Sequence, residues 1–155
     1  MIVDSALALA GSISGNTVTF QSTSGTDTSV LSTNTVDLSI ARDIGEGGDL
    51  YGRFEVGTAA SGGTSVEMQV IAADAANLTG NVTVIGTTGA IAVASLTAGA
   101  RFACGLNPRL ATKGQRYVGL RFVTVGAVTA LTTYGDLGLE IQDGQKFYGS
   151  GFAVL

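Results

Sequence analysis

The chain has 155 residues, of which 45% are hydrophobic and only 13% are charged, and its formal net charge is −4 at pH 7. Its eight basic residues form no cluster, which excludes a phosphate-binding groove, so neither nucleic acid nor an anionic membrane surface is an expected partner. The sequence contains no histidine, which removes the usual general base, the usual zinc ligand and every Ser–His or Cys–His pair.

The N-terminal residues are predicted to form an extended arm. Residues 6–10 are apolar, but Asp4 stands where a signal peptide carries basic residues, and the apolar run is too short for a membrane span. We therefore expect a soluble protein made in the cytoplasm. Residues 1–15 are assigned to the arm, and residues 16–155 to one β domain that is long enough to bury its own core.

Residues 34–56 are predicted to form a hairpin-like unit around a polar elbow. Apolar and polar residues alternate over 34–40 and again over 50–56, which is typical of half-buried strands. Between these strands, Gly45 and Gly47 allow the positive φ angles of a sharp reversal, and Arg42 and Asp43 can form a charge-assisted hydrogen bond. The Arg42–Asp43 pair is either a structural clamp, which we favour, or a contact with a partner.

The remaining elements are short strands. Apart from a loop at 107–115 and turns near 57–63 and 126–134, the pattern predicts strands at 16–21, 64–72, 82–85, 90–95, 101–106, 116–125 and 136–142, with a loop at 22–33. In the last strand, Leu137, Leu139 and Ile141 are expected to face the core. About eight short antiparallel strands without a long helix predict a single-domain, all-β jelly roll or β-sandwich.

The candidates for catalytic chemistry are few. Cys104 has the parity of an inward-facing residue, which favours a structural role. Asp49 with Glu55, or Glu67 with Glu140, could form the carboxylate pair of a glycosidase, but acids on the outward face of strands are usually only solvated. The sequence also lacks a calcium-binding loop and a phosphate-binding motif. We therefore expect no enzyme activity, no cofactor and no metal.

The C-terminal segment is rich in aromatic residues. Residues 146–155 include Phe147, Tyr148 and Phe152. Such an apolar end, in a chain with few charges, can dock on a partner. The alternative is that it caps the open end of the domain, and the sequence alone leaves both open.

Several blocks, taken in order, share a pattern with one protein family. They are MIVDS at 1–5, NTVDL at 34–38, ARDIGEG at 41–47 followed by Leu50 and Tyr51, and RYVGLRF at 116–122 followed by GAVT at 126–129 and a closing strand that ends at Gln142. This ordered set resembles the tailed-phage capsid cement (decoration) proteins with a jelly-roll fold. Two features depart from the pattern: the turn at 106–109 differs, and the tail after Gln142 is longer.

The resemblance implies a non-enzymatic virion component that is made in the cytoplasm of a host bacterium. Such a protein binds the outer surface of the capsid as a homo-oligomer and bridges major capsid subunits, which stabilises the mature shell. The implied partners are the major capsid protein and further copies of the chain, as a dimer, which we favour, or a trimer. The expected contact residues are Met1, Ile2, Val3, Leu7 and Leu9 in the arm and Phe147, Tyr148 and Phe152 in the tail.

Other functions fit the same fold. A lectin-like carbohydrate-binding jelly roll is one, although sugar-binding surfaces favour tryptophan and the chain has none. A structural component of a phage tail or baseplate is another. A glycan hydrolase would need one of the two acid pairs to be a working site.

Overall fold

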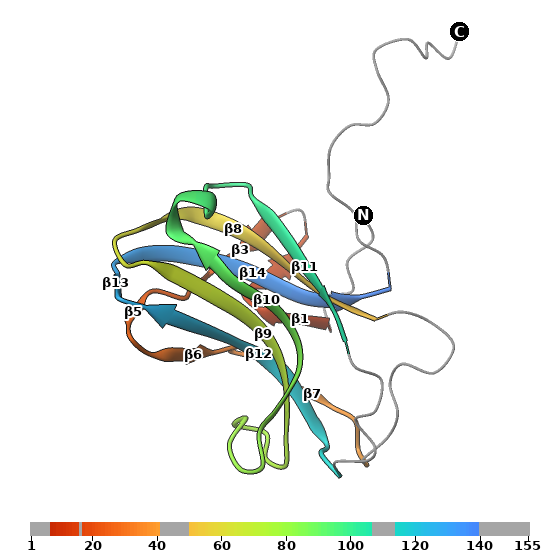
Figure 1. Cartoon of the computed structure of the whole chain (residues 1–155). Coiled ribbons are helices and arrows are strands. Elements are labelled where there is room, and N and C mark those ends of the chain that lie inside the picture. The colour runs from red at the N-terminus through yellow and green to blue at the C-terminus, as the bar shows by residue number, and fades with distance from the viewer. Residues whose placement is uncertain (1–6, 16, 41–49, 107–113, 140–155) are drawn as a thin grey trace, which may run out of the picture.

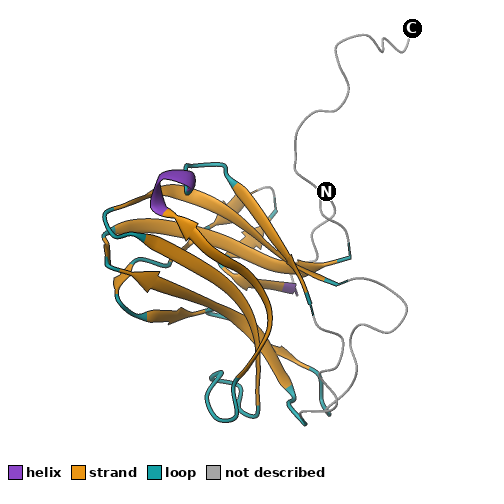
Figure 2. Cartoon of the chain, in the orientation of Figure 1, coloured by secondary structure: helices purple, strands orange, loops and turns teal. Residues whose placement is uncertain are grey.

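The computed structural model describes residues 7–15, 17–40, 50–106 and 114–139. In these residues two antiparallel five-stranded sheets pack face to face as a sandwich (Figure 1), and strands dominate the chain (Figure 2). The prediction of an all-β fold is confirmed. No helix in the described part of the chain is long and apolar enough to cross a bilayer.

The first sheet is built around β14 and β8. Its strands, in spatial order, are β1 (Ala8–Ala10), β14 (Ala130–Gly138), β8 (Tyr51–Ser61) and β11 (Arg101–Gly105), and β4 (Gln21–Ser22) also pairs with β14. The second sheet is built around β9 and β12. Its strands are β10 (Thr83–Ala92), β9 (Ser65–Ala73), β12 (Tyr117–Val125) and β6 (Ser29–Leu31), and β7 (Val36–Asp37) also pairs with β12.

Three small elements complete the described chain. Two are two-stranded sheets, β2 (Ser12–Ser14) with β3 (Thr17–Thr19) and β5 (Gly25–Thr26) with β13 (Ala127–Val128), and the third is a 3-10 turn, η2 (Val93–Ser95). The described residues therefore hold the strands β1 to β14 rather than about eight. The difference arises from two- and three-residue edge strands, which are too short to show a period-two pattern.

The core lies between the two sheets and follows the predicted alternation. Phe54 and Phe122, from opposite sheets, are 2% and 0% exposed, and their rings meet edge to face with centroids 6.0 Å apart. This geometry suits the quadrupoles of two aromatic rings. The alternating apolar residues of the predicted strands 64–72 and 116–125 are all buried: Val66, Met68, Val70, Val118, Leu120 and Phe122.

The prediction of a hairpin over residues 34–56 is wrong. β7 pairs with β12 in the second sheet, whereas β8 pairs with β14 and β11 in the first. The chain therefore crosses from one sheet to the other between these strands. Alternation predicts which face of a strand is buried but not which strand lies beside it. The elbow residues Arg42, Asp43, Gly45 and Gly47 lie outside the described residues.

The prediction of an arm over residues 1–15 is wrong for β1. Ala8–Ala10 pairs with β14, and all three residues are buried, with Leu9 only 1% exposed. Because both faces of this strand are covered, its sequence is continuously apolar and shows no alternation. Leu9 is thus a core residue rather than an exposed contact, and Leu7 is half-buried.

Two other boundaries differ from the predictions. The predicted strand 82–85 and the first part of the predicted strand 90–95 belong to one strand, β10, whose register shifts between Val84 and Gly86 and between Thr87 and Ala90, whereas the rest of the second prediction forms the 3-10 turn η2. Leu139, predicted to face the core, is 70% exposed because β14 ends at Gly138. Ile141 lies outside the described residues, and the predicted loop 22–33 contains β5 and β6.

Candidate functional site

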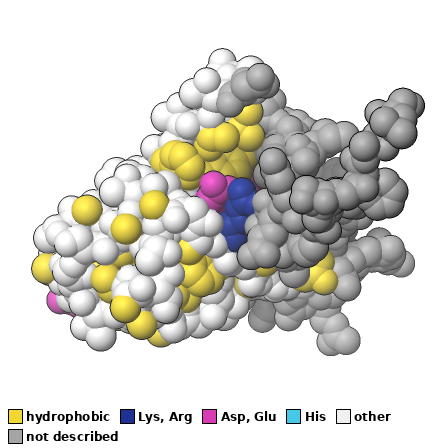
Figure 3. All heavy atoms as spheres, turned by 90° about the horizontal axis from the view of Figure 1, so that it is seen from above, with side chains coloured by type: hydrophobic (Ala, Val, Ile, Leu, Met, Phe, Trp, Pro, Cys, Tyr) yellow, Lys and Arg dark blue, Asp and Glu magenta, His cyan; other side chains and the backbone are white. Residues whose placement is uncertain are grey.

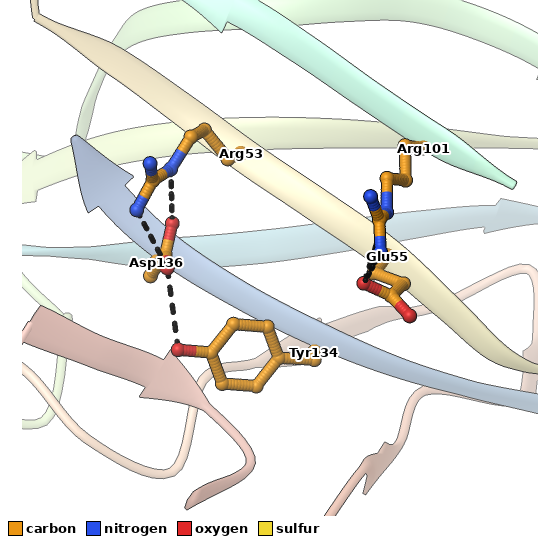
Figure 4. Close-up of polar contacts among 5 residues, drawn as sticks. All are labelled: Arg53, Glu55, Arg101, Tyr134 and Asp136. Atoms are coloured by element: carbon orange, nitrogen blue, oxygen red, sulfur yellow. Dashed lines mark hydrogen bonds and ion pairs between the residues drawn. The ribbon is translucent and has the colours of Figure 1, made fainter. Parts of the chain in front are cut away.

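The outward face of the first sheet carries a group of charged side chains, which we call the outer-face cluster. β8 turns Phe54 toward the core, so its neighbours in sequence point outward. The strand register then places residues of β14 and β11 beside them on the same face. The outer-face cluster consists of Arg53, Glu55, Arg101, Tyr134 and Asp136 (Figure 4).

Arg53 and Asp136 form the centre of the cluster. The guanidinium donates two parallel hydrogen bonds to the carboxylate, from Nε to Oδ1 at 2.7 Å and from Nη2 to Oδ2 at 2.8 Å. The hydroxyl of Tyr134 donates a third bond to Oδ2 at 3.2 Å. Asp136 is 1% exposed, so these donors replace the water that a buried carboxylate loses.

Two local features hold this arrangement in place. Burial, and then the negative charge of Asp136, raise the pKa of Tyr134, so its hydroxyl keeps the proton that it donates. Gly138 lies beneath the Arg53 side chain, where a Cβ atom would collide with the guanidinium. A larger residue at this position would therefore force the Arg53 guanidinium to shift from its place beside Asp136.

Glu55 and Arg101 form a second pair, nearer to solvent. The Arg101 Nη2 atom lies 3.1 Å from Glu55 Oε2, and the two side chains are 36% and 29% exposed. The outer-face cluster thus contains two acids and two bases and is neutral as a whole. Figure 3 shows an acidic and a basic side chain next to one another on the upper face, with hydrophobic side chains on either side.

A third ion pair joins Asp37, at the end of β7, to Arg116, the residue just before β12. Its two hydrogen bonds are 2.5 Å and 2.6 Å long, and the backbone N–H of Ser39 donates to Asp37 Oδ1 at 2.7 Å. The guanidinium also lies over the ring of Tyr117, 5.1 Å from its centroid. The hydrogen bonds from Arg116 are the main reason that the pKa of Asp37 falls to about 2.

The sequence interpretation missed this third pair, although a signal was present. Asp37 belongs to the NTVDL block and Arg116 begins the RYVGLRF block. The two blocks are separate motifs in the sequence, and the structure brings them into contact where β7 pairs with β12. Charged residues that recur in two distant motifs are therefore a reason to expect a contact between those motifs.

The carboxylates considered for catalysis are each held by their own neighbours. Glu67 Oε1 accepts hydrogen bonds from Gln69 Nε2 at 2.7 Å and from Thr87 Oγ1 at 2.6 Å, which lower the pKa of Glu67. Glu55 pairs with Arg101 as described. Their proposed partners Asp49 and Glu140 lie outside the described residues, so the structure measures neither acid pair.

Cys104 and the metal-ligating side chains complete the inventory. Cys104 is buried, as predicted, and its burial raises the pKa of the thiol to about 11, which leaves it protonated and a poor nucleophile. In the described ranges, no three Cys, Asp or Glu side chains gather closely enough to hold a metal ion. Cys104 packs in the core, and the acids described above pair with neighbouring arginine, amide or hydroxyl groups.

Most of the predicted contact residues cannot be placed. Met1, Ile2 and Val3 lie outside the described residues, as do the tail residues Phe147, Tyr148 and Phe152. Two of the predicted contact residues are described. Leu9 lies in the core of the sandwich, and Leu7 is half-buried at its margin.

A family model matches most of the chain. A family model described as Bbp16 matches residues 19–135, which is more than half of the 155-residue chain. The match runs from the end of β3 into β14 and includes both Asp37 and Arg116. No curated protein matches the chain.

Proposed function

The chain belongs to the Bbp16 family, and from that premise we propose that it is a bacteriophage capsid decoration protein. It binds the outer surface of the assembled capsid as a homo-oligomer and bridges neighbouring major capsid subunits. It acts in the virion without catalysis and without a cofactor. The proposal is supported first by the ordered sequence blocks that resemble capsid cement proteins.

The contact between two of those blocks is the observation that carries the proposal. Asp37 and Arg116 lie 79 positions apart in sequence, and they form an ion pair with two hydrogen bonds beside the pairing of β7 with β12. Blocks that meet in space form one structural unit, which is harder to obtain by chance than separate short motifs. Both blocks also fall within the stretch that the family model matches.

The surface chemistry also suits a lasting contact with another protein. The charges of the outer-face cluster are paired within the chain, so covering this face does not require an unpaired ion to lose water. The low charge content of the chain has the same effect over the rest of the surface. A face of this kind is suited to cover by a neighbouring protein.

The proposed action follows from linkage. A protein that binds the expanded shell, and not the unexpanded one, stabilises the expanded state by mass action. An oligomer that touches several capsid subunits gains avidity, so weak individual contacts suffice. The decorated shell therefore better resists the pressure of packaged DNA.

The test is to mix the purified full-length protein with expanded empty capsids and to measure co-sedimentation and stoichiometry. We expect saturation at a fixed ratio to the major capsid protein, and a higher melting temperature of the decorated shell. Unexpanded capsids are the matched control and should bind much less. Absence of binding to expanded capsids would overturn the proposal, and stoichiometric binding to tails instead would assign the protein to the tail or baseplate.

A truncation tests the N-terminal contact without damaging the fold. Deleting residues 2–6 should leave the melting temperature unchanged, because β1 begins at Ala8, and should weaken capsid binding if this segment reaches a capsid neighbour. Deleting residues 1–15 is unsuitable because it removes Leu9 from the core. Equal capsid binding by the shorter truncation and the full chain would exclude a role for residues 2–6.

A further inference from the structure

The ribbon of β2 (Ser12–Ser14) and β3 (Thr17–Thr19) has a strand edge without a partner in the described structure. It follows β1 directly, and its pairs are Ser12 with Thr19, Ile13 with Val18, and Ser14 with Thr17. Within the described ranges, the only backbone hydrogen bonds of β2 and β3 are those that join the two strands. Figure 1 shows the ribbon, in red, behind the first sheet.

The ribbon is fixed at its base and exposed beyond it. At one end, Gly11 has a φ of +84° and packs against the carbonyl of Thr19. At the same end, the ring of Phe20, which follows Thr19, covers Gly57 of β8, where an added Cβ would lie 2.5 Å from the ring. All three residues of β3 are exposed, with Val18 at 41%. A two-stranded ribbon of this kind has little stability of its own, so a further strand would stabilise it.

The edges of the ribbon lack the usual protection against strand addition. Natural edge strands are commonly protected by charged residues, proline or bulges. β10, at the edge of the second sheet, shows two register shifts. The ribbon has neither a charged residue nor a proline in residues 12–19, and its register is regular. This edge is therefore open to β-augmentation.

The register also indicates which backbone groups are available. Two residues separate Ser14 from Thr17, so these form a hydrogen-bonded pair, as do Ser12 and Thr19. Val18 then belongs to a non-hydrogen-bonded pair, and its N–H and C=O point away from β2. Val18 and Ile13 also share one face of the ribbon, while the Ser and Thr side chains share the other.

We propose that β3 accepts an extended, uncharged strand of the major capsid protein, with an apolar residue beside Val18 and polar residues on either side of it. This inference rests on the proposed function and names the contact that performs it. A contact along the three residues of β3 would bury far less surface than the roughly 1,200 Å² that a stable interface between two proteins buries. The contact is therefore suited to a lattice, where many weak contacts act together, rather than to a free dimer.

The test compares two substitutions at Val18 for binding to expanded empty capsids. Val18→Pro removes the outward N–H, and we expect an affinity about tenfold weaker than that of the wild type. Val18→Thr keeps the N–H and the β-branched shape and should bind as the wild type does. Hydrogen exchange provides a direct measurement, because the Val18 amide should become protected when the wild-type protein binds capsids.

The outcomes separate this inference from the proposed function. If Val18→Pro binds as well as the wild type, the inference is wrong and the decoration function stands. If both substitutions weaken binding equally, the side chain makes the contact and strand addition is wrong. If Val18→Pro lowers the mass of the free oligomer instead, the edge joins two copies of the chain, which also overturns the inference. If the wild-type protein does not bind capsids, the proposed function itself fails.

The fold of the proline variant is checked by its melting temperature, which should be unchanged because the ribbon contributes nothing to the core. If the melting temperature falls, a variant with a Gly–Ser segment of equal length in place of residues 12–19 replaces it. That variant lacks the preformed edge and should also bind about tenfold more weakly. Wild-type affinity in it would overturn the inference.

Discussion

Two arginine–aspartate pairs of nearly equal geometry occupy very different surroundings in this protein. Arg53 with Asp136, and Arg116 with Asp37, each form two hydrogen bonds of 2.5–2.8 Å. The side chains of the first pair are 17% and 2% exposed, whereas those of the second are 45% and 43% exposed. The geometry of the two pairs is shared, so burial is the main difference between them.

Burial makes the first pair difficult to break and the second easy to replace. If Asp136 is removed, the guanidinium and the Tyr134 hydroxyl remain in a site that offers them little water. If Asp37 is removed, water can solvate Arg116 at once, and the net contribution of such exposed pairs is small. The comparison teaches that the first pair belongs to the fold, while the second can be adjusted without unfolding the chain.

The largest expected effect is that of Asp136→Ala. Removing one partner of a buried ion pair typically costs about 3–5 kcal/mol, and here it also leaves the buried Tyr134 hydroxyl without the carboxylate that it donates to. We expect the free energy of unfolding, measured with urea, to fall by about that amount. The double variant Arg53→Met with Asp136→Leu is the control and should recover most of the loss. A loss as small as that of an exposed pair would remove the distinction between the two pairs.

A smaller effect is expected for Gly138→Ala. The added methyl group would displace the Arg53 guanidinium from Asp136, at a cost of about 1–3 kcal/mol typical of overpacking. Gly114→Ala is an unsuitable control because its φ is +74°, whereas Gly105→Ala has room for a methyl group and an ordinary φ. A neutral result at Gly138, measured by urea unfolding, would mean that Arg53 can move without leaving its partner.

The smallest effect, and the most specific, is the pH dependence of the exposed pair. The folded state lowers the pKa of Asp37 from 3.8 to about 2, so the stabilisation is fully present above pH 3.8 and is lost as the pH falls toward about 2. Asp37→Asn lacks this contribution at every pH. The difference in urea midpoint between the two proteins should therefore be small near pH 6 and vanish near pH 2. A difference that persisted at the lowest pH would assign it to something other than the charge of Asp37.

The sequence was most informative where alternation was regular. Met68 and Phe122 were placed correctly in the core because their strands are long and covered on one face. Ala8–Ala10 was missed because a strand covered on both faces resembles an apolar terminal segment. The prediction of a hairpin over residues 34–56 was wrong because strand pairing depends on residues that are distant in sequence. In addition, β7 is only two residues long, so its local pattern says little about its partner.

The charged residues show the same limit. Parity indicated that Arg53 and Glu55 point outward, but not that the register would place Asp136 and Arg101 beside them. The ion pairs are set by partners 46 to 83 positions away in sequence, which no local pattern can supply. The contact of Asp37 with Arg116 was not predicted, although both residues belong to the motif blocks.

The pairing of β1 with β14 has a consequence for how the protein folds as it is made. Ala8 pairs with Asp136, so one of the first strands to leave the ribosome waits for one of the last. Synthesis at roughly 5–20 residues per second makes the wait between Ala8 and Asp136 on the order of ten seconds. During this time the nascent chain exposes Leu9 and Phe54, which makes it prone to aggregate until β14 is made. Such non-local topologies also fold slowly after denaturation.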